Sequence, residues 1–294
     1  MRAGALAYGF LGLGRMGGPM AANLAKAGIA LAVFDRAGTA ERAAPGARVA
    51  AGAAEIAASC DTVFLSLPAG PDVHAVLAEL IGAPRRRAAE VIDLSTIGIA
   101  AAEDAARRCA QSGITYHDAP VSGGRAGALA ATISVMWAGP RERLEAHRPT
   151  LAAMAKNVFH VGDRPGQGQA LKLLNNFLSA TATAATAEAL LFGRAQGLDL
   201  KTMLDVVNAS TGRSAASEGK YMRNVLPGTF DSGFGADQMA KDLALYREAL
   251  AAAGTAGALG AEVAELWRQA AAALSGEDHT RVFEFLAQRR DATK

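Results

Sequence analysis

Residues 166–192 read GQGQALKLLNNFLSATATAATAEALLF, with glycines at the start, no proline and an apolar repeat too long for a strand. This pattern predicts one long, largely buried helix over about residues 169–192. Lys172 and Asn176 lie four residues apart near its beginning, so their side chains share one helix face. A lysine on such an apolar helix either extends to water or is held for chemistry, and the helix alone does not choose between these readings.

Length and composition limit the kinds of protein to consider. The 294 residues suggest about two domains, and a hydrophobic fraction of 51% allows a sizeable core. The net charge of +2 gives no case for a nucleic acid partner, and residues 83–87, with three arginines, are expected to form a solvated loop. No apolar run reaches the roughly 18 residues that span a bilayer, and the first residues lack a signal-peptide pattern. We therefore expect a cytoplasmic protein without a membrane partner.

The cysteines and histidines show no metal-binding pattern. Cys60 and Cys109 are far apart, and the chain contains neither CxxC nor HExxH. We expect two reduced thiols and no metal site.

The first 35 residues have the order expected of a dinucleotide-binding unit. An apolar strand over residues 5–11 is followed by a G-x-G-x-x-G loop, a helical stretch from residue 19 to 27 and a second strand over residues 29–34. Glycines let a backbone approach a pyrophosphate, and the following helix N-terminus favours its charge. The alternative is a tight strand–helix turn without a ligand. The expected cofactor-binding residues of the loop are Gly12, Leu13, Gly14, Arg15, Met16 and Gly17.

The acidic residue after the second strand indicates which cofactor to expect. Asp35 lies 21 residues after Gly14, close to the spacing of a carboxylate that binds the ribose 2′-hydroxyl. A 2′-phosphate would be repelled by this charge, which favours NAD. Arg36 is the counter-argument, because a guanidinium can accept a phosphate, so NADP stays possible.

Three further strands alternate with helices through the first half. Strands are predicted over residues 62–67, 91–94 and 114–118, with helices between them, which predicts a parallel, doubly wound α/β sheet of the Rossmann type. Ligands of such sheets bind beyond the carboxyl ends of the strands. The residues that follow the strands are therefore expected to face one cleft, although each alone reads as an ordinary turn: Leu67, Pro68, Thr96, Ser122, Gly123 and Gly124.

The second half is predicted to be all-helical. Two more strands over residues 132–137 and 158–161 precede a glycine- and proline-containing stretch, which places the domain boundary between residues 163 and 164. Helices are predicted over residues 200–208, 236–252, 258–274 and 279–288, and the long helix joins the two domains. Alanine-rich helices between residues 249 and 274 suit close helix contacts, so we expect a homodimer or homotetramer.

These motifs together resemble those of the β-hydroxyacid dehydrogenases, the group of 3-hydroxyisobutyrate dehydrogenase and tartronate semialdehyde reductase. The resemblance covers nearly the whole chain. The segments that carry it, in order, are residues 12–20 (GLGRMGGPM), 118–124 (DAPVSGG), 166–176 (GQGQALKLLNN), 241–243 (KDL) and 276–279 (GEDH).

The resemblance implies a role for each matching residue. Lys172 would be the catalytic acid/base, with Asn176 holding the substrate and Ser122, Gly123 and Gly124 binding its carboxylate. Leu67, Pro68 and Thr96 would contact the cofactor. From the second domain, Lys241 and Asp242 would belong to the cofactor-binding set and Phe234 to the substrate site, with Phe234 and Asp242 lining the cleft.

The chemistry gives a lysine a reason to be there. Hydride transfer from a C–OH group requires a neighbour that accepts the hydroxyl proton. A free lysine, with a pKa of about 10.4, is a poor base at neutral pH, but burial beside a positively charged nicotinamide favours the neutral amine. Asn176 can donate to or accept from the hydroxyl. The expected function is NAD(P)-dependent interconversion of a short 3-hydroxy acid and its semialdehyde.

Other functions remain open from the sequence. One alternative within the family is a tartronate semialdehyde reductase, and residues 208–221, where substrate selection is expected, do not decide between them. Decarboxylating 6-phosphogluconate-type enzymes usually carry histidine where Asn175 stands, and imine reductases generally lack the lysine. A non-catalytic cofactor-binding scaffold is the alternative outside enzymes. Two residues depart from the family pattern: Ala131, where glycine is common, and Trp137, where a smaller residue is expected.

Overall fold

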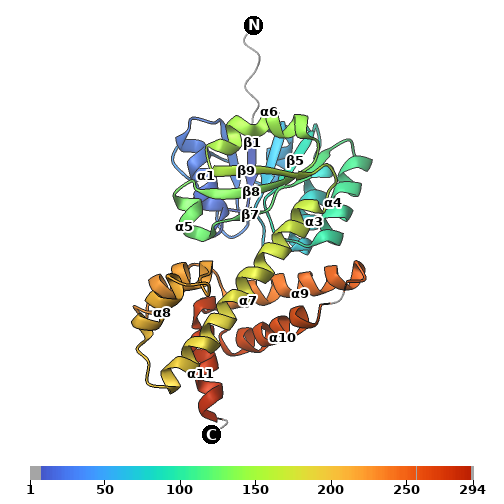
Figure 1. Cartoon of the computed structure of the whole chain (residues 1–294). Helices are drawn as coiled ribbons and strands as arrows, with labels where there is room; N and C mark the ends of the chain where they lie inside the picture. The colour runs from blue at the N-terminus through green and yellow to red at the C-terminus, as the bar shows by residue number, and fades with distance from the viewer. Residues whose placement is uncertain (1–7, 256, 293–294) are drawn as a thin grey trace. The chain divides into compact units, whose positions relative to one another are not determined.

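The computed structural model describes residues 8–255 and 257–292. The chain divides into two compact units, one ending at Lys172 and the other starting at Leu173 (Figure 1). This division falls inside helix α7 (Gln167–Ala195), which is slightly longer at both ends than the helix predicted over residues 169–192. The domain boundary predicted between residues 163 and 164 stays a prediction.

The described part of the first unit forms a nine-stranded sheet. Its strands are β1 (Tyr8–Leu11), β2 (Leu31–Phe34), β3 (Arg48–Val49), β4 (Thr62–Leu65), β5 (Glu90–Asp93), β6 (Thr115–Asp118), β7 (Val121–Ser122), β8 (Ile133–Ala138) and β9 (Ala155–Gly162). Their order across the sheet is β3-β2-β1-β4-β5-β6-β8-β7, and β9 pairs with β8. The predicted Rossmann-type architecture is confirmed.

The sheet is mixed rather than wholly parallel, and this corrects the sequence-based expectation. All neighbours from β3 to β6 are parallel, but β8 runs antiparallel to both β6 and β7. A parallel connection needs a long crossover, usually a helix that packs across a sheet face. Between β6 and β8 the chain forms only β7 and the six-residue helix α5 (Gly124–Leu129), and it turns back along the sheet.

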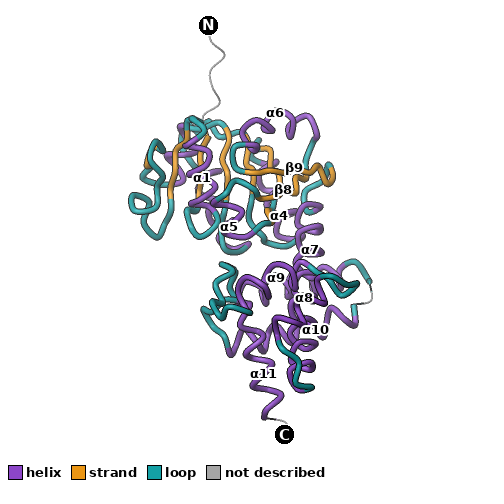
Figure 2. Tube along the Cα trace, turned by 60° about the vertical axis from the view of Figure 1, so that its left-hand side comes forward, coloured by secondary structure: helices purple, strands orange, loops and turns teal. Residues whose placement is uncertain are grey.

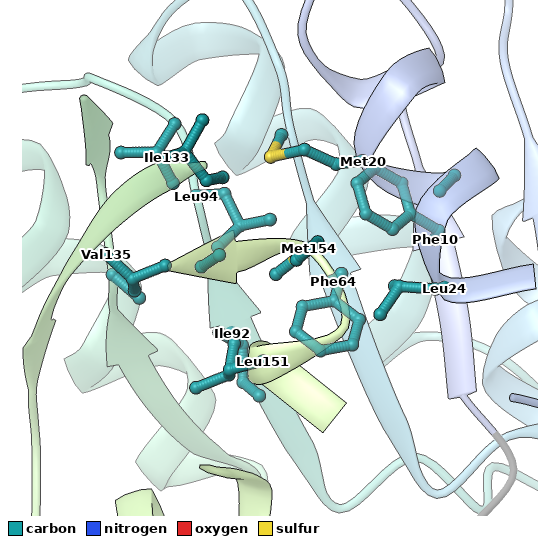
Figure 3. Packing of buried hydrophobic residues seen from close by; sticks show 14 of the residues in the cluster. Phe10, Met20, Leu24, Phe64, Ile92, Leu94, Ile133, Val135, Leu151 and Met154 are labelled. Atoms are coloured by element: carbon teal, nitrogen blue, oxygen red, sulfur yellow. The ribbon is translucent and has the colours of Figure 1, made fainter. Parts of the chain in front are cut away.

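Helices cover both faces of this sheet. The others in the first unit are α1 (Gly17–Lys26), α2 (Ala53–Ser59), α3 (Gly70–Ile81), α4 (Ile99–Gln111) and α6 (Arg141–Ala152). Alternate strand residues supply two cores. Phe10 and Phe64 pack with residues of α1 and α6 such as Leu24 and Leu151 (Figure 3), whereas Leu11 and Leu65 belong to the core under α2, α3 and α4. Helix α6 was not predicted from the sequence.

The described residues of the second unit form helices and loops, and the strands seen in Figure 2 all lie in the first unit. After α7 come α8 (Leu200–Asn208), η1 (Ala216–Val225), α9 (Ala236–Ala252), α10 (Ala258–Ala273), η2 (His279–Arg281) and α11 (Val282–Ala292). The predicted all-helical half is confirmed. The segment η1, a π-helix with one extra residue per backbone hydrogen-bonded turn, was not predicted.

The two departures from the family pattern have local explanations. Ala131 has a φ of 55°, in the left-handed region that glycine adopts without strain, which explains why glycine is common there. Trp137 is fully buried, and its ring stacks on that of His117 with centroids 4.4 Å apart. The larger side chain at position 137 is therefore part of the core of the first unit.

Candidate active site

The glycine-rich loop joins β1 to α1. Gly12 has a φ of 93°, and a Cβ atom there would collide with the carbonyl oxygen of Ser66, while one at Gly17 would collide with that of Gly12. Both glycines are therefore required by the fold. A Cβ at Gly14 would meet no atom within 4 Å, so the protein itself gives no reason for glycine at this exposed position. Close approach of a ligand to the backbone gives one, and the loop fits a dinucleotide pyrophosphate.

The flanking loop residues differ in burial. Leu13 is buried in the core, Met16 is half-buried against it, and Arg15 is exposed. The Leu13 backbone N–H donates to Asp35 Oδ2 at 2.6 Å. The acidic residue after β2 is thus attached directly to the glycine loop.

Two arginines follow Asp35 in the sequence, and their positions affect whether the site favours the ribose 2′-hydroxyl of NAD or the 2′-phosphate of NADP. Arg36 pairs with Glu79 of α3 at 3.2 Å. Arg42 instead lies 3.5 Å from Asp35 Oδ1. Sequence reasoning missed Arg42, because it stands seven residues after Asp35 in an irregular loop and no local signal links the two residues.

The loops after β4 and β5 are hydrogen-bonded to each other. The Leu67 backbone N–H donates to Ser95 Oγ at 2.9 Å, and the Ser95 N–H donates to Asp93 Oδ1 at 2.9 Å. Pro68 is exposed and Thr96 half-buried, so both predicted cofactor contacts are accessible. The first unit thereby brings together the loops that follow β1, β4 and β5, at the carboxyl edge where ligands of such sheets bind.

The beginning of α7 is fixed to this edge by two buried residues. Asp118, at the end of β6, accepts the backbone N–H groups of Gly166 and Gln169, each at 2.9 Å. Burial raises the pKa of Asp118 to about 7, although these two bonds oppose the shift. Gln169 Oε1 accepts the N–H groups of Ile97 and Gly98 at 2.9 and 3.1 Å.

Sequence reasoning gave neither Asp118 nor Gln169 this positioning role. For Gln169 no local signal existed, because Ile97 and Gly98, whose N–H groups it accepts, lie 72 and 71 residues away in the sequence. For Asp118 no local signal existed, because its partners lie 48 and 51 residues away in the sequence.

Lys172 follows Gln169 by almost one turn, and only 8% of its surface is exposed. The Lys172 side chain therefore does not extend to water, which was one of the two alternatives that the sequence left open. The predicted carboxylate-binding loop also belongs to the first unit. Ser122 ends β7, and Gly123 and Gly124 follow with φ values of 125° and 63°, which glycine adopts without a Cβ penalty.

The remaining predicted residues lie in the second unit. Asn176 is 7% exposed, and its Nδ2 donates to Asp242 Oδ2 at 2.6 Å. Lys241 Nζ lies 3.2 Å from the other oxygen of Asp242. These three residues form one connected polar group between α7 and α9.

Phe234 is the last of the predicted site residues in the second unit. It is half-buried against the core of the second unit, and its ring packs edge-on to His279 with centroids 5.6 Å apart.

Within the described residues no group of three or more His, Cys, Asp or Glu side chains could hold a metal ion. None of the described helices is long and apolar enough to span a bilayer.

Two family models match the chain. They are the NAD binding domain of 6-phosphogluconate dehydrogenase over residues 7–162, and the NAD-binding domain of NADP-dependent 3-hydroxyisobutyrate dehydrogenase over residues 166–286. A 2-(hydroxymethyl)glutarate dehydrogenase of Eubacterium barkeri is 38% identical over 245 residues, covering 82% of this chain and 81% of that protein. A 3-hydroxyisobutyrate dehydrogenase of Pseudomonas aeruginosa is 38% identical over 297 residues, covering 93% and 96%.

A solved structure gives the same result for the fold. The Mycobacterium tuberculosis 3-hydroxyisobutyrate dehydrogenase with L-serine has a TM-score of 0.87 and 34% identity, covering 96% of this chain and 99% of that one. The matches extend through both units, over the glycine loop and over the helix that carries Lys172. The chain therefore belongs to the β-hydroxyacid dehydrogenase family that includes 3-hydroxyisobutyrate dehydrogenase, and it is an NAD(P)-dependent 3-hydroxyacid dehydrogenase.

Proposed function

We propose that this enzyme interconverts a short 3-hydroxy acid and its semialdehyde, with Lys172 as the general acid/base and NAD as the cofactor. The relatives act on 3-hydroxyisobutyrate and 2-(hydroxymethyl)glutarate by name, and one structure holds L-serine. All three molecules carry a hydroxyl on the carbon next to the α-carbon of a carboxylate. This shared arrangement defines the substrate class that we propose.

Burial of Lys172 is the observation that carries the proposal. Its helix is held by Gln169, whose side chain bonds the loop after β5, and by Asp118 at the end of β6. The start of α7 is thus fixed at the carboxyl edge of the sheet, and the Lys172 side chain that it carries is buried. A neutral amine can take the hydroxyl proton, and the ammonium can return it in the reduction direction.

The other residues would orient the substrate. The nicotinamide, when bound, accepts the hydride from the carbon that bears the hydroxyl. The Asn176 amide would hold that hydroxyl, and Asp242 fixes the orientation of the amide by accepting from its Nδ2. The Ser122 hydroxyl and the N–H groups of Gly123 and Gly124 would bind the substrate carboxylate, because glycine leaves their backbone accessible.

The position of Asp35 supports NAD over NADP. Its carboxylate is held at the end of β2 by the Leu13 N–H, where a 2′-phosphate would meet a like charge. Arg42 lies beside Asp35 and reduces this repulsion. The preference for NAD over NADP is measured by comparing kcat/KM with the two cofactors for each substrate.

Replacement of Lys172 tests the assignment. Lys172→Ala should lower kcat by about 10²–10⁴-fold, because a positioned general acid/base contributes that much. NAD affinity, measured by quenching of intrinsic fluorescence, should stay within a factor of two. The matched control is Lys201→Ala, which removes an exposed lysine paired with Asp205 on α8.

The substrates for this test are 3-hydroxyisobutyrate, L-serine and 2-(hydroxymethyl)glutarate, each oxidised with NAD, and tartronate semialdehyde, which is reduced with NADH. A Lys172→Ala enzyme that keeps more than a tenth of its turnover on the best of them would show that another group moves the proton. Preference for tartronate semialdehyde would identify the alternative within the family. If the unaltered protein binds NAD but turns over none of them, this result favours the non-catalytic scaffold.

We also propose a homodimer or homotetramer located in the cytoplasm. Leu178 and Phe192 on α7 are 58% and 69% exposed, on the helix face opposite Lys172, where a second copy would cover them. Cys60 and Cys109 are free and buried, which fits a reducing compartment. A monomer at micromolar concentration in analytical ultracentrifugation would contradict the proposed homodimer or homotetramer.

A further inference from the structure

The face of α7 that carries Lys172 and Asn176 continues with two hydroxyl side chains. Ser179 follows Asn176 by three residues and Thr183 follows Ser179 by four. Residues at these spacings lie above one another on one helix face. Thr183 is fully buried and Ser179 half-buried. The predicted catalytic pair is thus the first part of a longer polar row along α7.

A second lysine is attached to this row. Lys220, on η1, donates from its Nζ to Ser179 Oγ at 2.8 Å and to Thr183 Oγ1 at 3.0 Å. Its half-buried side chain therefore places an amine on the same helix face as Lys172 and Asn176, farther along α7. An α-helix rises about 1.5 Å per residue, so the amine lies about 5–10 Å beyond Asn176 along the helix axis.

The charge of Lys220 is not neutralised by contact. Within the described part of the chain its nitrogen bonds these two neutral hydroxyls and forms no ion pair. The Asp278 carboxylate lies close enough to favour the ammonium, but it accepts from Ser232, Gly233 and Thr280 instead. The neighbouring His279 disfavours the ammonium when it is protonated. Burial lowers the pKa of Lys220 to about 8, so most of the amine is still charged at neutral pH.

The segment that carries Lys220 is attached to α7 without the help of this lysine. The next residue, Tyr221, is fully buried, and its hydroxyl donates to the backbone carbonyl of Thr183 at 2.8 Å. The π-helical form of η1 is a rare backbone geometry that is frequent at functional sites. An ammonium held on neutral hydroxyls, beside an anchor that already fixes the segment, is suited to binding an anion.

We propose that Lys220 binds a second anionic group of the substrate. The preferred substrate is then a 3-hydroxy acid with a further carboxylate at the end of a short carbon chain on its α-carbon. This inference rests on the proposed function, because it assumes that the hydroxyl is held between Lys172 and Asn176.

Paired substrates test this assignment. The enzyme is assayed with NAD on 2-(hydroxymethyl)glutarate, which has two carboxylates, and on 3-hydroxyisobutyrate, which has one. The unaltered enzyme should show at least a tenfold higher kcat/KM on the dicarboxylate. Lys220→Met should raise the KM for the dicarboxylate at least tenfold more than that for the monocarboxylate. Lys220→Arg should retain most of the preference.

Lys201→Met is the matched control, because it removes an exposed lysine from the neighbouring helix α8 and should leave the preference unchanged. Far-UV circular dichroism and NAD affinity establish that each variant is folded. If Lys220→Met does not fold, Lys220→Gln keeps a hydrogen-bond donor and replaces it. A purely structural role would lower kcat/KM on both substrates by the same factor, and this result would overturn the proposal.

Binding without turnover separates this inference from the proposed function. Glutarate has two carboxylates and no hydroxyl, and its affinity for the NAD-loaded enzyme can be measured by calorimetry. It should bind at least tenfold more tightly than butyrate, and Lys220→Met should remove the difference. If the unaltered enzyme oxidises 3-hydroxyisobutyrate but shows neither preference, Lys220 does not select the substrate and the proposed function stands. If it oxidises neither hydroxy acid, the proposed function is wrong, and equal affinity for glutarate and butyrate would then also reject the role of Lys220.

Discussion

Two charged side chains, the buried Glu90 in the first unit and the half-buried Lys220 in the second, are held in opposite ways. Glu90 begins β5 and is 3% exposed, and it accepts from His117 Nε2 and His147 Nε2, each at 2.7 Å, and from Arg143 Nε at 3.0 Å. Burial alone would raise the pKa of Glu90, but these hydrogen bonds hold it well below its ordinary value. The carboxylate is thus fully surrounded by donors that the fold itself supplies.

Lys220 in the second unit has two neutral hydroxyl partners, where Glu90 has a guanidinium and two imidazole rings. Glu90 lies at the start of a parallel strand, the edge opposite the one where ligands of such sheets bind. The Lys220 amine is bonded to the face of α7 that also carries the predicted catalytic pair, Lys172 and Asn176. The difference separates two uses of a charged side chain: one that is neutralised by bonded partners in the fold serves stability, and one that has no directly bonded counter-ion is available to a ligand.

The largest expected effect follows from removing the charge of Glu90. Glu90→Gln should lower the free energy of unfolding of the first unit by about 3–5 kcal/mol, because a broken buried ion pair leaves its partners uncompensated. Urea denaturation followed by fluorescence measures this in a Trp267→Phe background, where Trp137 is the remaining tryptophan. Trp137 stacks on His117, so its emission reports on this cluster.

Acidification should reduce the difference in the free energy of unfolding between the unaltered protein and Glu90→Gln. The pKa of Glu90 in the folded state lies below its ordinary value of 4.5, so its contribution is complete above that pH and is lost as the pH falls below it. Glu145→Gln is the control, because Glu145 forms an exposed pair with Arg148, and loss of such a pair should change the stability little. Equal losses from Glu90→Gln and Glu145→Gln would show that the cluster does not stabilise the fold.

The sequence predicts those parts of the fold whose signals are local. The glycine loop is encoded within six consecutive residues, and α7 by an uninterrupted apolar repeat, so both could be located. The antiparallel β8 could not, because the alternation of apolar residues along a strand carries no information on its direction. The residues around Glu90 are also hidden, since His117 and His147 lie 27 and 57 residues from it and look like ordinary polar positions.

The same limit applies to the candidate site. Lys172, Asn176 and Ser122 could be named because motifs surround them. Gln169 and Asp118, which hold α7 in place, are recognised only when their partners on distant strands are known. Lys220 lies within residues 208–221, where substrate selection was expected, but it was not singled out there, because η1 is π-helical and a search for a period of 3.6 residues does not find such a segment.

The smallest expected effect concerns stability at Lys220, and it has the opposite sign from that at Glu90. The pKa of Lys220 falls from 10.5 to about 8 on folding, so below pH 8 the folded state carries an ammonium that burial destabilises. Lys220→Met, despite losing two hydrogen bonds, should therefore stabilise the unliganded second unit by about 1 kcal/mol at pH 7. From pH 8 to 10.5 the unfolded chain holds this proton longer than the folded one, so the unaltered protein gains stability and the difference shrinks.

Urea denaturation in a Trp137→Phe background measures this difference, because Trp267 is fully buried in the core of the second unit. A loss of several kcal/mol at pH 7, like that expected for Glu90→Gln, would mean that the fold neutralises Lys220 after all. A small gain in the unliganded protein, together with weaker dicarboxylate binding, is instead what a residue retained for its ligand should show. Lys220 would then lower the stability of the unliganded protein, and the substrate carboxylate would supply the negative charge that its ammonium lacks.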